Sequence, residues 1–96
     1  MIAEKFSKEI GVTHADFFRL LSRAMTDTPH SIDGLKVTGQ LSEGTVTIVL
    51  GEQQVRRIAL MAIPYANVSF TFDGVSEAER KRFMENFDLR FQRGGG

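Results

Sequence analysis

Apolar and polar residues alternate with two different periods along this chain of 96 residues. From residue 14 to residue 25 the apolar residues recur every three or four positions, which predicts an amphipathic helix. Thr13 stands at the N-cap position of that helix, and Asp16 follows three residues later. The helix should end before the segment 26–29, because the residue before Pro29 avoids helical backbone angles. Its buried stripe is predicted to contain Phe17, Leu20, Leu21 and Ala24.

The following residues show a period of two, which is typical of half-buried β-strands. We expect four strands here, at residues 35–41, 45–50, 55–63 and 67–72. Glycine in Glu43-Gly44 and Gly51 marks the first two connections, and Pro64-Tyr65 should break the chain between the last two strands. Short connections between successive strands predict an antiparallel meander.

A second helix is predicted near the C-terminus, where Ser76 and Glu79 form a capping-box pattern. Its buried stripe would consist of Phe83, Met84, Phe87 and Phe91, and the helix should run to about residue 92 before the glycines end it. Leu89 lies off this stripe, so we expect it to be exposed or to contact a partner.

Residues 1–11 fit two interpretations. Phe6 and Ile10 share even parity with Ile2, which suits an edge strand, but the same spacing of four also suits a helix that ends at Gly11. We favour the strand.

These elements together predict an α+β fold with two layers, in which an antiparallel sheet of four or five strands carries two helices on one face. The element order is (β)-α-β-β-β-β-α. One domain would occupy residues 1–93, and the glycines 94–96 would form a flexible tail.

Two resemblances accompany this fold. The element order resembles half of a TATA-binding-protein-like fold, an architecture that is reused for unrelated functions. The segments His14-Ala15-Asp16-Phe17-Phe18-Arg19 and Phe87-Asp88-Leu89-Arg90-Phe91-Gln92-Arg93-Gly94-Gly95 resemble a family of small bacterial proteins to which no activity is attached. This second resemblance implies a bacterial cytoplasmic setting.

Composition narrows the function further. Twelve basic and twelve acidic residues cancel, which argues against a dedicated nucleic-acid-binding protein, although the basic run 80–82 leaves weak binding open. The chain has no cysteine, so disulfides, thiolate nucleophiles and cysteine-ligated metals are excluded. No signal peptide or membrane-spanning segment is expected, so the cytoplasm is the predicted location.

Few residues suggest catalysis. A metal site would need His14 and His30 to lie close together with a carboxylate such as Asp16 or Asp33, and we expect no metal and no cofactor. No glycine-rich phosphate loop or nucleophile elbow is present. A small enzyme or accessory factor with a site near His14, His30 and Tyr65 stays open as an alternative function.

The leading hypothesis is a non-enzymatic interaction module that binds a protein partner or a second copy of itself, through its open sheet face or through the groove between the sheet and the helices. The sheet face away from the helices would supply an apolar centre with a polar rim, as in a modest protein interface. The candidate residues of that face are Thr47, Val49, Arg57, Ala59, Met61 and Ser69. A sulfur-carrier role for the Gly-Gly end is disfavoured, because the element order differs from that of ubiquitin-like folds.

Overall fold

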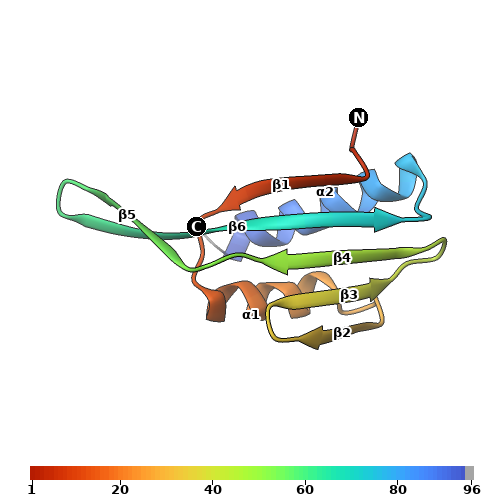
Figure 1. Cartoon of the computed structure of the whole chain (residues 1–96), viewed down its shortest axis with the longest axis horizontal. Coiled ribbons are helices and arrows are strands. Elements are labelled where there is room, and N and C mark those ends of the chain that lie inside the picture. The colour runs from red at the N-terminus through yellow and green to blue at the C-terminus, as the bar shows by residue number, and fades with distance from the viewer. Residues whose placement is uncertain (95–96) are drawn as a thin grey trace.

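The computed structural model describes residues 1–94 and confirms an α+β fold with an antiparallel sheet and two helices (Figure 1). Six strands are present among these residues, in the order β-α-β-β-β-β-β-α. The elements are β1 (Lys5–Ile10), α1 (His14–Ala24), β2 (His30–Asp33), β3 (Lys36–Gln40), β4 (Thr45–Leu50), β5 (Gln54–Ile58), β6 (Met61–Asp73) and α2 (Glu77–Gly94). Of the predicted flexible tail at residues 94–96, Gly94 is the last residue of α2, and residues 95–96 lie outside this description.

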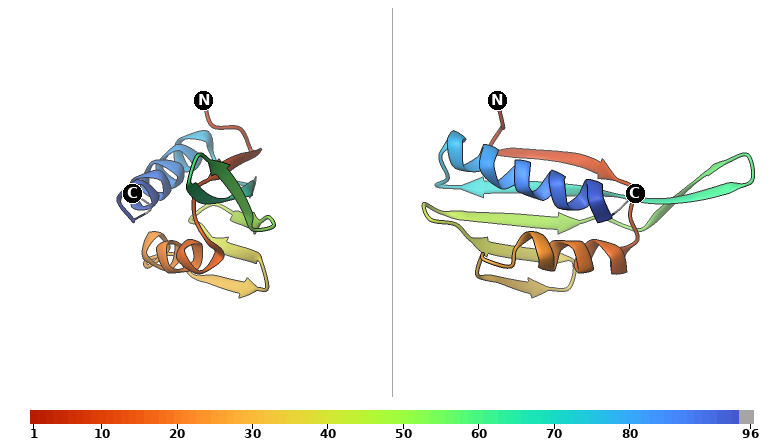
Figure 2. Two further views of the ribbon diagram at one scale, coloured as in Figure 1. Left: turned by 90° about the vertical axis from the view of Figure 1, so that its left-hand side faces the viewer. Right: turned by 180° about the vertical axis from the view of Figure 1, so that it is seen from behind.

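Strand β6 organises the sheet, because it is 13 residues long and pairs with three other strands. The strand order is β1-β6-β4-β3-β2, and β5 pairs with the first part of β6. The favoured interpretation of the N-terminal residues is confirmed, since β1 runs antiparallel to β6 from Lys5 opposite Thr71 to Ile10 opposite Ala66. Both helices cover the same face of the sheet, as the two views of Figure 2 show.

The core lies between that face and the helices, and aromatic rings fill its centre. Phe87 of α2 stacks on Phe91 with 4.1 Å between ring centroids and meets Phe70 of β6 edge-on at 5.0 Å. Phe17 of α1 lies 5.3 Å from Phe91 and so joins the two helices. The predicted stripes are confirmed in both helices, except that Phe83 is only partly buried.

The two predicted helix starts differ in their outcome. The Thr13 hydroxyl accepts a hydrogen bond from the Asp16 backbone N–H at 3.1 Å, as predicted. The Ser76 hydroxyl likewise accepts from the Glu79 N–H at 3.2 Å. The Glu79 carboxylate was expected to reach back to the helix start, and this expectation is wrong: it accepts hydrogen bonds from the backbone and hydroxyl of Ser42.

A strand that the sequence pattern did not indicate forms the β2 edge of the sheet. His30 was expected in a loop, but it begins β2, which pairs with β3 from His30 opposite Gly39 to Asp33 opposite Lys36. All four side chains of β2 are exposed, so the strand has no buried face that would give an alternating pattern of apolar and polar residues. Gly34 closes the hairpin with a φ of +61°, an angle that glycine adopts without strain.

The predicted continuous strand 55–63 is also wrong. The chain turns at Ala59-Leu60, so that Ile58 lies opposite Met61 and a hairpin replaces the single strand. Ala59 adopts a φ of 55°, an angle that alanine rarely adopts. The sequence has no glycine or asparagine at this position to indicate the turn. Pro64 does not break β6, because β1 ends at Ile10, opposite Ala66, and leaves the edge of β6 at Pro64 without a strand partner among residues 1–94.

Candidate interaction site

The hairpin of β5 and the first part of β6, residues 54–65, projects beyond the rest of the molecule and is called the arm. Figure 1 shows it extending past the ends of β1, β4 and both helices, and the right-hand view of Figure 2 shows the same from behind. The arm contributes to a long axis of 46 Å, against 27 and 21 Å across the other axes. A two-stranded hairpin in water gains little stability by itself. The stability of the arm therefore depends on its contacts with the rest of the molecule.

The tip of the arm, Ile58–Met61, is apolar and exposed. Leu60 is fully exposed, and Met61 and Ile58 are 63% and 53% exposed. Seven apolar residues follow one another from Ile58 to Pro64, and no acidic residue occurs from Gln53 to Phe72. Exposed clusters of large apolar side chains mark interaction sites. The uninterrupted apolar run was the sequence signal for this candidate site, but it was interpreted as part of one continuous strand at residues 55–63.

Gln53 fixes the base of the arm. Its side-chain amide donates to the carbonyl of Val12 and to that of Tyr65, both at 3.2 Å. Its side-chain oxygen accepts from the backbone N–H of His14 at 2.7 Å. One side chain thus joins β6, the start of α1 and the segment that leads into β5, and sequence patterns gave no indication of it.

Two further contacts hold the arm against the body. The His14 ring donates from Nε2 to the carbonyl of Gly51 at 2.8 Å. Arg56 donates from both terminal nitrogens to the two carboxylate oxygens of Glu9, at 2.9 and 3.2 Å, and its guanidinium lies over the Tyr65 ring at 4.5 Å. The hydrogen bonds from Arg56 lower the pKa of Glu9 below its ordinary value of 4.5. The direction of the arm is therefore set by specific polar contacts.

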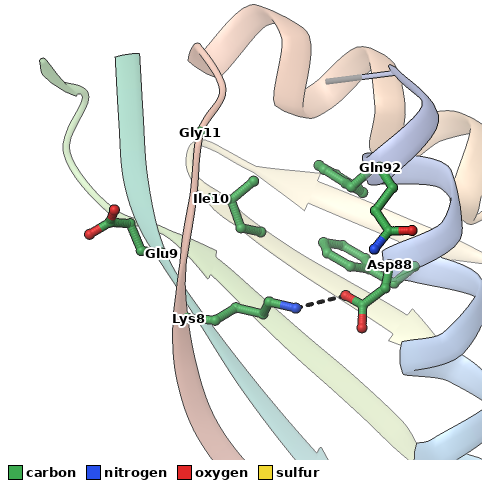
Figure 3. Close-up of a pocket in the computed structure, with 8 residues that line it drawn as sticks. Lys8, Glu9, Ile10, Gly11, Asp88 and Gln92 are labelled. Atoms are coloured by element: carbon green, nitrogen blue, oxygen red, sulfur yellow. Dashed lines mark hydrogen bonds and ion pairs between the residues drawn. The ribbon is translucent and has the colours of Figure 1, made fainter. Parts of the chain in front are cut away.

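A groove lies between β1 and the C-terminal half of α2, next to the base of the arm (Figure 3). Its volume is about 300 Å³, near the lower limit for pockets that hold small ligands. Ile10, Phe87 and Phe91 provide an apolar floor, and Lys8 bridges the groove to Asp88 with a 2.7 Å ion pair. Figure 3 shows Lys8 and Ile10 pointing toward α2, whereas Glu9 points to the other side of β1.

The six residues predicted to form one interaction face occupy two places. Thr47, Val49 and Ser69 lie on the open face of the sheet, where Val49 is directly opposite Ser69. Arg57, Ala59 and Met61 lie in the arm. The separation follows from the turn at residue 59, which carries the second group away from the sheet centre.

The open face of the sheet itself is mostly polar. Thr38, Thr47 and Thr71 stand side by side across three strands, and Val49 is 42% exposed in their midst. One apolar side chain among hydroxyl groups does not make an apolar patch. The exposed apolar surface of the predicted interface belongs to the arm.

The residues of the alternative enzymatic site do not converge. His14 begins α1, and His30 follows its other end, so the helix of 11 residues, roughly 16 Å long, separates them. His30 bonds through Nδ1 to the Thr28 carbonyl at 2.7 Å, whereas the Tyr65 ring lies beside Arg56 in the arm. Within residues 1–94, no cluster of three or more potential ligands could hold a metal ion.

The basic residues named from the sequence are spread over several elements. Arg80 donates to the carbonyls of Ile2 and Val75, so it ties the N-terminal segment to the start of α2. Arg19 pairs with Asp16 on α1, and Arg56 pairs with Glu9. These contacts hold the three arginines at separate places on the fold. In the part of the chain that the structure describes, neither helix has the length and apolar character needed to cross a bilayer.

No protein-family model, curated protein or solved structure matches this chain. The functional argument therefore rests on the geometry of the arm, its base and the neighbouring groove.

Proposed function

We propose that this chain is a non-enzymatic protein-interaction module and that the arm is its binding element. The observation that carries the proposal is the apolar tip: Ile58, Leu60 and Met61 are exposed at the far end of a hairpin whose base is held by specific hydrogen bonds. Burying such side chains against a partner stabilises a complex by about 1.5–3 kcal/mol for each large side chain. A pre-positioned arm also reduces the ordering cost of binding.

The charge of the arm supports the same function. Arg57 is exposed beside the tip, and the arm contains no carboxylate. An apolar centre with a cationic rim suits a protein surface that has an apolar depression and acidic residues around it. The bacterial cytoplasm is the setting we propose for this interaction, on the sequence resemblance alone.

Affinity capture with matched variants tests the proposal. The wild-type chain, the tip variant Leu60→Lys/Met61→Lys and the control Leu89→Lys would each serve as bait in a lysate that also contains an untagged copy of the chain. Leu89 is 46% exposed on α2, so the control adds a charge at an apolar surface position outside the arm. We expect the tip variant to lose the proteins that both other baits retain.

Circular dichroism and thermal unfolding would first establish that all three baits are folded. Because the tip side chains are exposed, the tip variant should unfold within about 0.5 kcal/mol of the wild type. A folded tip variant that captures the same proteins in the same amounts as the wild type would refute the arm as the binding element.

A further inference from the structure

We propose that the partner of the arm is a second copy of this chain, and that the two copies exchange arms so that the tip of each enters the groove of the other. This inference rests on the proposed function, because it names the occupant of the same site. It concerns the tip residues Ile58–Met61 and the groove between β1 and α2.

The position of the groove makes the exchange geometrically self-consistent. Gly11 in the wall of the groove lies beside the carbonyl of Pro64, at the base of the arm. Two arms placed side by side in opposite directions bring each tip to the base of the other arm. The tip-to-base distance is that of the five-residue strand β5, roughly 17 Å, and it is the same in both copies. A two-fold arrangement therefore fills both grooves at once and leaves no arm free.

The floor of the groove suits the tip chemically. Phe87 is buried, so the accessible apolar surface comes from partly buried Ile10 and from Phe91, which is 8% exposed. A leucine or methionine side chain can contact both residues there. A volume of about 300 Å³ admits the side chains of a hairpin tip but not a bulky helix. Leu60 and Met61 are the most exposed large apolar side chains of the arm, so this contact would bury the most apolar surface from them.

The rim of the groove complements the charge beside the tip. The carboxylate of Asp88 uses one oxygen for Lys8 and is 44% exposed, so it can accept a further hydrogen bond. Arg57 stands one residue before the tip, within reach of that rim when the tip is seated. A guanidinium and a carboxylate can then pair across the interface.

Cysteine cross-linking gives a direct test, because the chain has no cysteine of its own. One sample would carry Leu60→Cys and a second Gln92→Cys, at the tip and at the groove. After mixing and re-equilibration, we expect a short bifunctional maleimide to join the two variants. Lys81→Cys is the control: it lies outside the groove and eleven residues from Gln92, roughly 16 Å along α2. When it replaces Gln92→Cys, we expect less than about a tenth of that yield, because the distance exceeds the reach of a short linker.

Sedimentation of the purified protein tests the affinity. We expect a dimer at micromolar concentration, and we expect Leu60→Lys/Met61→Lys to raise its dissociation constant at least about a hundredfold through lost apolar burial. A wild-type chain that stays monomeric up to about 100 µM would overturn the inference, whether or not it binds vesicles of anionic lipid or another protein. If the monomeric wild type still loses its captured proteins upon tip substitution, the proposed function stands without this partner. A dimer that the tip substitutions do not weaken would overturn this inference, and a folded tip variant that also captures the same proteins as the wild type would overturn the proposed function.

Discussion

Removing the side chain of Gln53 should loosen the arm more than its exposed position on the surface indicates. The Gln53→Ala variant loses two hydrogen bonds to the carbonyls of Val12 and Tyr65 and one from the His14 N–H, which lies in the first turn of α1. Each such bond contributes about 0.5–1.5 kcal/mol, and partial access of water lowers the cost of leaving the groups unpaired. We expect the free energy of unfolding to fall by about 2 kcal/mol, with a decrease in Tm of roughly 8–15 °C for a domain of this size.

Urea unfolding and amide hydrogen exchange measure this effect globally and locally. In Gln53→Ala, the amides of β5 should exchange faster than in the wild type, because the base of the arm opens more often. Gln54→Ala is the matched control: it removes the same side chain one position further along, where no side-chain hydrogen bond is lost within residues 1–94. Stability within about 0.5 kcal/mol of the wild type, with unchanged exchange in β5, would refute the assignment of Gln53 as the clamp of the arm.

Three other substitutions have defined outcomes. Phe87→Ala leaves a cavity in the core and should lower the free energy of unfolding in urea by about 3–5 kcal/mol. Leu89 is exposed, so Leu89→Ala should lower it by less than about 0.5 kcal/mol. Ala59→Gly should slow exchange in the arm by relieving a φ of 55°, worth about 1 kcal/mol; faster exchange would contradict this. Arg56 lowers the pKa of Glu9, so their contact stabilises the fold above pH 4.5, and this stabilisation is lost as the pH falls through the lowered pKa. In the Arg56→Ala variant, an NMR titration should show the pKa of Glu9 closer to 4.5.

Secondary structure was predicted most accurately for the elements that are buried on one face only. Both helices carry a stripe that faces one core, so the spacing of Phe17, Leu20 and Leu21 and of Met84, Phe87 and Phe91 indicated their positions directly. Strand β4 alternates in the same way, with Val46, Ile48 and Leu50 buried. Periodicity reports burial, and these segments are buried on one face only.

The same reasoning could not find β2 or the arm, because neither has a buried face. The side chains of β2 are all exposed, and those of β5 are too. The turn at Ala59-Leu60 lacks the glycine or asparagine that usually accompanies a positive φ. Of the residues predicted for one interaction face, Met61 and Arg57 lie in the arm and not beside Val49 and Ser69 on the sheet. Gln53 and the groove at Asp88 depend on contacts between distant segments that local patterns do not encode.

The shared strand β6 also has a consequence for how the chain reaches this structure. The half of β6 in the arm pairs with its immediate neighbour β5, whereas the other half pairs with β1 at the opposite end of the chain. Local pairing closes a short loop and can form quickly, but Lys5 can meet Thr71 only after the 65 residues between them have been made. The arm can therefore form before the sheet that supports it is complete, and its apolar tip is exposed already at that stage of folding.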